Sequence, residues 1–394
     1  MKRSRLGRRS GLSRDAEHLT WLAVGLAESG SRAEDSFWER RLSDQVEKLL
    51  EEGDEDTLNS ALDHLFATQA NAYDELADLI ESRAESGSPE SGSPESSEND
   101  VLLIAAPVMA WSRFAITAAT IPSALLANLR VHLQAHVLAD GVKLGLADYL
   151  FSPDQLPQGY CETRRFATAL GEAAAAGQTL HIETGSLPET AKFLSDVRYI
   201  LAAAVVPRGA ALFRWQERDG TREQALAQWR AQGGAIIHTL MPGSAQEVVL
   251  PDAYFAASRQ ADRDSRPYSL HASVAFLTTT LEIAPDAIRA VIAAFEDRQV
   301  EEYRIGFTRK NSDDVIHGVV WPLLGPEDEN SEIAQEIETA LRACGVTDIV
   351  QLETRFPLEY CDDCGAPMYP SPDGEAVHAE LPEENADAVP KHLH

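Results

Sequence analysis

The sequence has few basic residues, few cysteines and no long apolar run. Its 34 lysines and arginines face 63 aspartates and glutamates, which gives a formal net charge of −29. A body this acidic repels polyanions, which weighs against nucleic-acid binding through the main surface. No run approaches the ~18 apolar residues of a membrane span, so no membrane insertion is expected. Four cysteines in 394 residues are typical of a reducing compartment and require no disulfide framework.

Several motifs of common enzyme classes are also missing. The sequence contains no GxxxxGK[ST], GxGxxG or GxSxG, which argues against kinases, dinucleotide oxidoreductases and serine hydrolases in their usual forms. His132 and His136 have metal-ligand spacing on a helix, but Leu133 stands where HExxH needs a glutamate. Cys161 precedes two arginines, yet no histidine partner can be assigned to it. These absences favour a protein that is not an enzyme.

The first 14 residues differ from the rest of the chain. They contain six basic residues and no acidic one, so we interpret residues 1–14 as a basic disordered arm. Nucleic-acid binding is not expected except through this arm, which is the only segment suited to phosphate contacts. Because no apolar stretch follows the charges, the arm is not a signal peptide, and we expect a cytoplasmic protein.

A helical domain is predicted over residues 15–82. Leu19, Leu22, Ala23 and Leu26 recur at i, i+3, i+4 and i+7, and similar stripes follow as far as residue 80. The next segment, 83–100, repeats Glu-Ser-Gly-Ser-Pro in tandem and has almost no apolar residues. It cannot offset the entropy of ordering, so we interpret it as a flexible linker.

Beyond the linker, strands and helices alternate, which predicts an α+β fold class with two tandem ferredoxin-like (βαββαβ) units. The first unit is 101–258, with an insertion at 151–198, and the second is 259–356. In the first unit the expected strands are 101–109, 142–149, 199–206, 210–216 and 235–241, of which 199–206 and 210–216 are expected to form a hairpin. The expected helices are 123–138 and 222–232. In the second the expected strands are 270–276, 303–307, 315–321 and 347–355, and the expected helices are 285–294 and 331–344.

The most definite chemistry lies in the tail, 357–394. Cys361 and Cys364 flank two residues, and Gly365 permits the tight turn of a zinc knuckle. A structural zinc ion generally has four ligands, and His378 and His392 complete a Cys₂His₂ set within the tail. The segment 367–375 between them is expected to form a hairpin or turn.

Other interpretations of the knuckle stay open. Cys344 is an alternative ligand, although its place at a helix end suits a packed residue. The CxxC pair is also compatible with reduced, metal-free cysteines. A redox dithiol is less favoured because the pair does not open a helix, whose N-terminus would lower a thiol pKa. If zinc is bound, a structural role is expected, because the tail offers no evident cleft for catalysis.

Three segments carry a resemblance to a known family. They are Ala27–Ser31 followed by Phe37-Trp38-Glu39, then Ala61–His64, and finally Tyr360–Gly365. In these segments the chain resembles an uncharacterised betaproteobacterial family, domain of unknown function 2863. The resemblance spans nearly all of the chain except the linker. It implies a bacterial cytoplasmic protein and no known activity, so it supplies no catalytic residues.

The function that fits these observations best is a non-enzymatic binding or regulatory protein with a structural zinc site at its C-terminus. Its partner is an unknown protein or small molecule. One alternative is an enzyme whose active site lies in the cleft between the two α+β units, which requires a deep pocket holding titratable groups of perturbed pKa. A second alternative is a nucleic-acid-associated protein that residues 1–14 tether.

Overall fold

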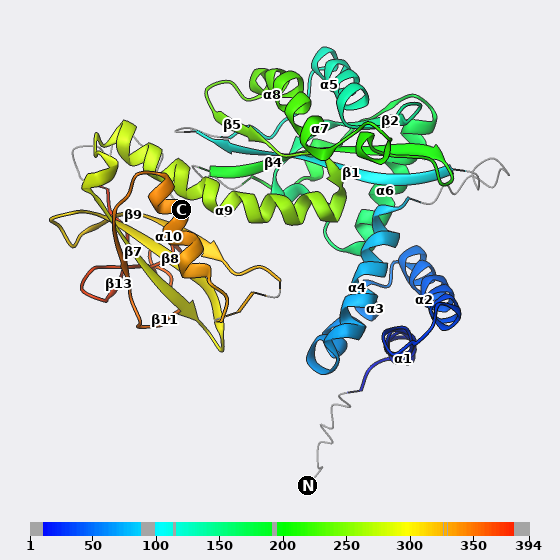
Figure 1. Ribbon diagram of the computed structural model, residues 1–394, viewed down its shortest axis with the longest axis horizontal. Helices are drawn as coiled ribbons and strands as arrows, with labels where there is room; N and C mark the ends of the chain where they lie inside the picture. Colours follow the sequence, from blue (N-terminus) through cyan, green and yellow to red (C-terminus); the bar gives the residue numbers. More distant parts are fainter. Residues whose placement is uncertain are drawn as a thin grey trace, which may run out of the picture.

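A bundle of helices and two separate sheets follow one another along the chain (Figure 1). The computed structural model describes residues 11–87, 99–112, 116–190, 195–325, 327–328 and 330–381. Within these residues the architecture is a mixture of α and β structure with a six-stranded, a five-stranded and a two-stranded sheet. No helix among the described residues is both long and apolar enough to cross a membrane.

Four helices build the N-terminal bundle: α1 (Arg14–Ala27), α2 (Arg32–Glu52), α3 (Glu55–Thr68) and α4 (Ala70–Glu85). The side chains of Ser13, Ser31 and Asp54 cap the first three by accepting backbone N–H bonds. Gly53, at φ 73°, ends α2 in the left-handed conformation that favours glycine. Leucines of the predicted stripes form the buried core of the bundle.

The central unit is a six-stranded sheet covered on both faces. Its elements in chain order are β1 (Asn99–Trp111), α5 (Ser123–His136), β2 (Lys143–Phe151), α6 (Tyr160–Ala175), β3 (Thr179–Leu180), β4 (Ser195–Pro207), α7 (Arg222–Gln228), α8 (Gly234–Leu240), β5 (Ala245–Val248) and β6 (Asp252–Ala253). The strand order is β3-β2-β4-β1-β5, with β6 also paired to β1. Helices α5, α7 and α8 cover one face, and α6 and the following helix α9 cover the other (Figure 1).

Two strands predicted for this unit are wrong. Residues 210–216 form a loop that ends in a single 3₁₀ turn, and the ring of Phe213 stacks on that of Trp215 at 4.4 Å between centroids. The third strand of the unit is instead β4, which begins at Ser195 and contains the strand expected over 199–206. Residues 235–241 lie in α8, because Gly233 does not end the preceding helix. A Cβ at Gly233 would lie 2.4 Å from the ring of Trp229, so this glycine makes room for a buried indole inside a continuing helical path.

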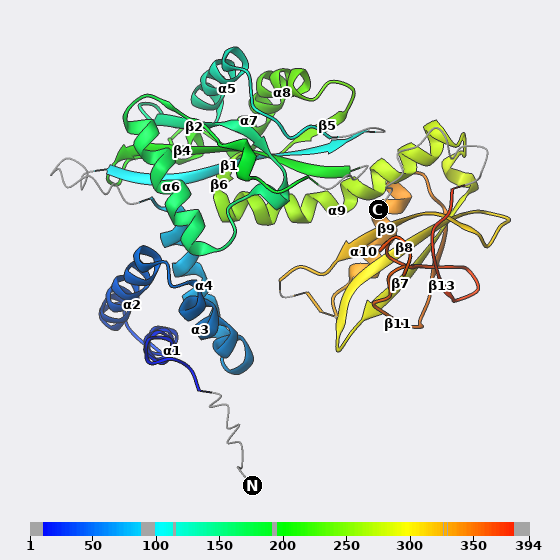
Figure 2. The same cartoon turned by 180° about the vertical axis from the view of Figure 1, so that it is seen from behind.

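A long helix, α9 (Tyr254–Thr280), joins the central unit to the C-terminal unit. Its first half packs on the central sheet through Ala257 and Ala261, and its second half enters the C-terminal core through Leu270 and Val274. The predicted boundary at 258/259 therefore falls inside this helix. Figure 2 shows α9 running from one sheet to the other without a break.

The C-terminal unit is built on a five-stranded sheet. Its elements are β7 (Ile288–Glu296), β8 (Val300–Arg309), β9 (Val315–Pro322), α10 (Ile333–Ala343), β10 (Asp348–Gln351) and β11 (Phe356–Pro357). The strand order is β10-β7-β8-β9, in which β10 and β11 run parallel to β7 and the other pairs are antiparallel. Helices α9 and α10 share one hydrophobic core with this sheet.

The first two elements predicted for the second unit are wrong. Residues 270–276, expected as a strand, lie in α9, and residues 285–294, expected as a helix, hold a 3₁₀ turn and most of β7. The order is therefore α-β-β-β-α-β instead of β-α-β-β-α-β. Strand β7 is buried on both faces, so apolar and polar residues do not alternate along it. Its sequence therefore lacks the two-residue hydrophobic period that identifies a half-buried strand.

The helical bundle contacts the central unit through a carboxyl group, that of Glu85, which accepts a hydrogen bond at the N-terminus of a helix. Glu85, in the last turn of α4, accepts a hydrogen bond from the backbone N–H of Phe255 at the start of α9, at 3.2 Å. The groups Glu81, Arg259 and Asp252 surround it. Burial raises the pKa of Glu85 to about 7, and this is the largest of several effects on it. Docking therefore places a carboxyl that titrates near neutral pH between the bundle and α9.

Candidate metal site

The backbone around Cys361 and Cys364 forms a tight turn at the end of a short ribbon, the two antiparallel segments 359–361 and 366–368, in which Tyr360 pairs with Pro367. The N–H of Gly365 donates to the carbonyl of Cys361 at 2.8 Å, and the N–H of Cys361 donates to the carbonyl of Ala366 at 2.7 Å. Gly365 has φ 72°, a left-handed conformation that side chains disfavour. Both thiols are thereby held on one turn, as the CxxCG spacing predicts.

A second hairpin returns the chain to this turn. Strand β12 (Tyr369–Pro370) pairs antiparallel with β13 (Ala376–Val377), and Gly374 at φ 81° lies in the connection. This matches the hairpin or turn expected over 367–375. His378 follows β13 directly, and its Nε2 lies 3.2 Å from Sγ of Cys364. One ligand atom from each of Cys361, Cys364 and His378 lies within 4.8 Å of the others.

This donor set fits a zinc ion chemically. Zinc in structural sites binds thiolate sulfur and imidazole nitrogen at ~2.0–2.3 Å in a tetrahedron, which separates neighbouring ligand atoms by about 3.3–3.8 Å. The 3.2 Å between Cys364 and His378 is close to that separation. Cys364 is exposed, whereas Cys361 and His378 are half-buried. One pair of the three ligand atoms is therefore close to the separation that a shared zinc ion requires, and the ligand atom of Cys361 lies within 4.8 Å of both.

The turn also favours the thiolate form of Cys361, which is the form that binds metal. Hydrogen bonds from the backbone N–H groups of Asp363 and Cys364 are the main causes that lower the pKa of the Cys361 thiol. The nearby carboxylate of Asp363 opposes them. The polypeptide that positions the sulfur therefore also stabilises its negative charge.

A buried arginine fixes the ribbon to the C-terminal sheet. Arg304 on β8 is 0% exposed, and its Nη1 donates to the carbonyls of Glu359 and Met368 at 2.7 and 2.8 Å. Its Nε pairs with Glu302 at 2.6 Å. The guanidinium also lies 5.0 Å from the ring centroid of Tyr360, beside the first cysteine. Because Glu359 and Met368 are on either side of the knuckle, Arg304 holds both strands of the ribbon at once.

The second hairpin rests on a flat part of the same sheet. Tyr369 is 1% exposed and covers Gly318 of β9, where a Cβ would lie 2.3 Å from the tyrosine ring. A Cβ on Gly306 of β8 would lie 2.3 Å from the carbonyl oxygen of Pro370. Two glycines side by side in the sheet therefore let the hairpin approach closely.

The sequence matches the family described as "Protein of unknown function (DUF2863)" over residues 4–392. The chain belongs to the DUF2863 family. No curated protein and no solved structure matches it. Because the family description names no activity, the chemistry of this DUF2863 protein has to be argued from its own residues.

The structure brings together three of the four ligands predicted for this DUF2863 protein, namely Cys361, Cys364 and His378. His392 lies outside the described residues, so its place in the site stays a prediction. Cys344, the alternative ligand, ends α10 with its thiol 3.1 Å from the carbonyl of Ala340. It packs against the core of the C-terminal unit, and burial raises its pKa to about 11. These features suit a packed cysteine and not a metal ligand.

The other candidates from the sequence have structural surroundings. The rings of His132 and His136 stack on α5 with centroids 5.6 Å apart, and they do not belong to the three-ligand group at the tail. Cys161 is buried against the helical bundle, and burial raises its pKa to about 12, so it is a poor nucleophile.

Sequence reasoning missed the role of Arg304. It lies in the predicted strand 303–307, on the face opposite to Tyr303 and Ile305. An arginine on that face suggests that the face is exposed to solvent. A charged residue between the alternating Tyr303 and Ile305 was the available signal, but only the tail packed on that face explains the burial of Arg304.

Proposed function

We propose that this DUF2863 protein is a non-enzymatic binding or regulatory protein whose C-terminal tail is clamped by a structural zinc ion. Cys361, Cys364 and His378 supply three ligands, and His392 supplies the fourth. The observation that supports this most strongly is the 3.2 Å contact between Cys364 and His378 across two separate turns. When bound, zinc would cross-link these turns through coordinate bonds and would make their association cooperative with metal binding.

The surroundings of the three ligands favour a structural role for the metal. A catalytic zinc keeps an open position beside a general base in a cleft. Here Cys364 is exposed, and the ribbon lies on a sheet face to which Arg304 and Tyr369 hold it. Contacts with the sheet on one side of the tail and a metal cross-link on its other side would together hold a chain end that has little apolar content.

The proposal includes the fold family and the compartment. We propose that the central unit is ferredoxin-like, because β1, α5, β2, β4, the α7–α8 helices and β5 follow in βαββαβ order with strand order β2-β4-β1-β5. The stretch α6–β3 is then an insertion. We also propose a cytoplasmic location, because all four cysteines are free thiols.

Metal analysis of the freshly purified, full-length protein tests the clamp. We expect about one equivalent of zinc, which Cys361→Ser and Cys364→Ser each remove and which Cys344→Ser retains. The Cys344→Ser variant is a matched control, because it removes a thiol of the same unit that lies outside the cluster. Loss of zinc in Cys344→Ser, or an empty and reduced site in the unchanged protein, contradicts the proposal.

The fourth ligand requires its own comparison. We expect His378→Ala and His392→Ala each to lower zinc affinity in competition with a chelator, because each removes one of four bonds. If His392→Ala binds zinc as the unchanged protein does while His378→Ala does not, the fourth ligand is not His392. Equal affinity in both variants and the unchanged protein would exclude the histidines altogether.

A further inference from the structure

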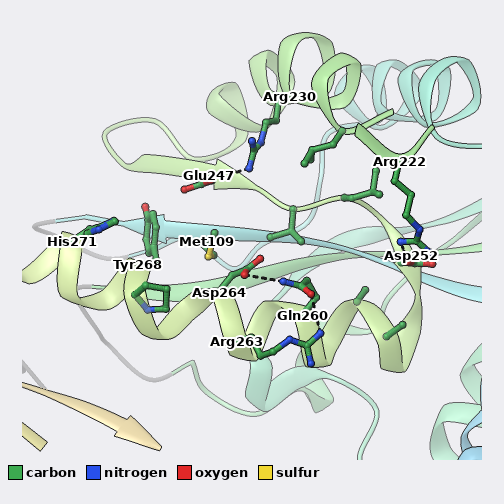
Figure 3. A pocket seen from close by; sticks show the side chains of 16 residues that line it. Met109, Arg222, Arg230, Glu247, Asp252, Gln260, Arg263, Asp264, Tyr268 and His271 are labelled. Carbon is green, nitrogen blue, oxygen red and sulfur yellow. Dashed lines mark hydrogen bonds and ion pairs between the residues drawn. The ribbon is translucent and has the colours of Figure 1, made fainter. Parts of the chain in front are cut away.

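A groove of about 650 Å³ lies in the central unit between α7, α9 and strand β5. Figure 3 shows it from close by, with α9 on one side and Arg230 and Arg222 reaching in from the other. It is lined by the central unit and by α9, and it is separate from the metal site on the C-terminal sheet. Its volume is in the ~300–1,000 Å³ range of small-molecule sites.

Part of the lining of the groove is apolar. Met109 of β1 lies at its centre in Figure 3. The side chains of Leu226, Val249, Leu250 and Ala257 also line it. This surface can take up aliphatic groups of a ligand and remove them from water.

Two arginines on the α7 side are neutralised by acids of the neighbouring strands. Arg222 pairs with Asp252 at 2.6 Å, and Arg230 pairs with Glu247 at 2.9 Å. Both arginine side chains are about half exposed, at 54% and 50%. These pairs add opposite charges in equal number and therefore leave no net charge on this wall.

The α9 side carries one positive and one negative charge that are not paired with each other. Gln260 joins them: its Oε1 accepts from Nη2 of Arg263 at 2.8 Å, and its Nε2 donates to Oδ1 of Asp264 at 2.8 Å (Figure 3). Among the described residues neither Arg263 nor Asp264 has an ion-pair partner within 4.0 Å, whereas both arginines opposite them do. A single amide thus connects a cation and an anion at the groove, with Gln260 lying between them.

We infer that this groove binds a small zwitterion, of the size of a short peptide with free termini and aliphatic side chains. The ligand's carboxylate pairs with Arg263, its ammonium pairs with Asp264, and its side chains cover Met109 and Val249. A simple anion is disfavoured because the chain carries a net charge of −29 and because Asp264 would stay unpaired. A simple cation leaves Arg263 unpaired in the same way.

The dipeptide Leu-Leu and its two blocked forms test this inference on the full-length protein by isothermal titration calorimetry. N-acetyl-Leu-Leu lacks the ammonium group, and Leu-Leu-amide lacks the carboxylate. We expect the free dipeptide to bind with a dissociation constant of up to about 1 mM. Each blocked form should bind at least about tenfold more weakly, because it loses one charged hydrogen-bonding group. This comparison needs no variant, so a failure to fold cannot obscure it.

Two substitutions assign the charges. In Arg263→Gln the dipeptide and its amide should bind equally, and in Asp264→Asn the dipeptide and its acetyl form should bind equally. Arg208→Gln is the matched control, because Arg208 is an exposed arginine of the same unit that does not line the groove. It should retain both preferences.

Two results overturn the inference: no binding of Leu-Leu up to about 10 mM, or equal binding of the free and both blocked dipeptides. The inference deepens the binding role proposed above. The zinc content of the same preparations, measured separately, decides the metal site, so either proposal can fail without the other.

Discussion

Arg304 offers the sharpest test of how the tail is held. Replacing it by methionine keeps an apolar side chain of similar length between Phe295 and Tyr360 but removes the guanidinium. The carbonyls of Glu359 and Met368 then lose their donor, and Glu302, 15% exposed, loses its cation. The variant therefore tests the charge and its hydrogen bonds separately from the bulk of the side chain.

The expected cost follows from these contacts. Hydrogen bonds to a charged group contribute about 1.5–3 kcal/mol each, and leaving the partner of a buried ion pair alone costs about 3–5 kcal/mol. Because Glu302 can turn toward water and the methionine recovers some packing, we expect Arg304→Met to destabilise the docked tail by about 3–5 kcal/mol. Since the same ribbon carries both cysteines, zinc affinity should fall by about 10–100-fold.

The assay is competition for zinc with a chromophoric chelator, joined with amide hydrogen exchange in the ribbon. The amides of Cys361 and Met368, which donate to Ala366 and Glu359, should exchange faster in the variant.

Arg266→Met is the matched control. Arg266 is also nearly buried, at 4% exposed, and it binds Glu327 through two hydrogen bonds of 2.7 and 3.1 Å. Because it lies on α9, away from the ribbon, its replacement should cost similar stability without changing zinc affinity. If both variants bind zinc as tightly as the unchanged protein, Arg304 does not position the knuckle and the reasoning is refuted.

Two further predictions concern docking. Burial raises the pKa of Glu85 from 4.5 to about 7, so the contribution of this carboxyl to the docking of α4 is present below pH 4.5 and is lost as the pH rises through 7. The loss in free energy of unfolding is about 2 kcal/mol after allowance for partial exposure. Glu85→Gln should abolish this loss in stability measured from pH 5 to 8. An unchanged pH profile would refute it. Gly318→Ala should push the ring of Tyr369 off the sheet and destabilise the tail by about 1–3 kcal/mol in thermal unfolding, whereas Gly185→Ala, with nothing within 4 Å, should be neutral. Equal melting temperatures of the two glycine variants would contradict it.

Local patterns predicted the helical bundle and the knuckle turn well, because each depends on neighbouring residues. The spacing of leucines over residues 19–80 corresponds to the buried faces of α1 to α4. The CxxCG spacing and the turn residues after it correspond to the turn and hairpin that bring Cys361, Cys364 and His378 together. In both segments the period or the turn chemistry is decided within a few residues.

The errors arise where burial on several sides hides the period. Leu270, Val274 and Phe276 lie an even number of residues apart in the sequence, which is the pattern of a strand. All three nevertheless enter one hydrophobic core, because α9 is covered over much of its circumference. The alanine-rich β7 resembles a helix, because Ala290 and Ile292 face α9 and α10 while Ala293 and Phe295 face the tail. No local pattern shows which surfaces will be covered.

Long-range contacts were equally out of reach. Arg304 contacts residues more than 50 positions away, and the groove combines Met109 with α9 residues beyond 256. Such sites depend on the tertiary fold, so the sequence supplied candidate residues for the metal and none for the groove.

Zinc K-edge X-ray absorption of the full-length protein, purified without added metal, tests the central claim most directly. The account predicts bound zinc with about two sulfur and two nitrogen ligands, at ~2.3 and ~2.0 Å. A spectrum without zinc from a protein whose four thiols are reduced, or zinc bound by oxygen and nitrogen alone, would contradict the account.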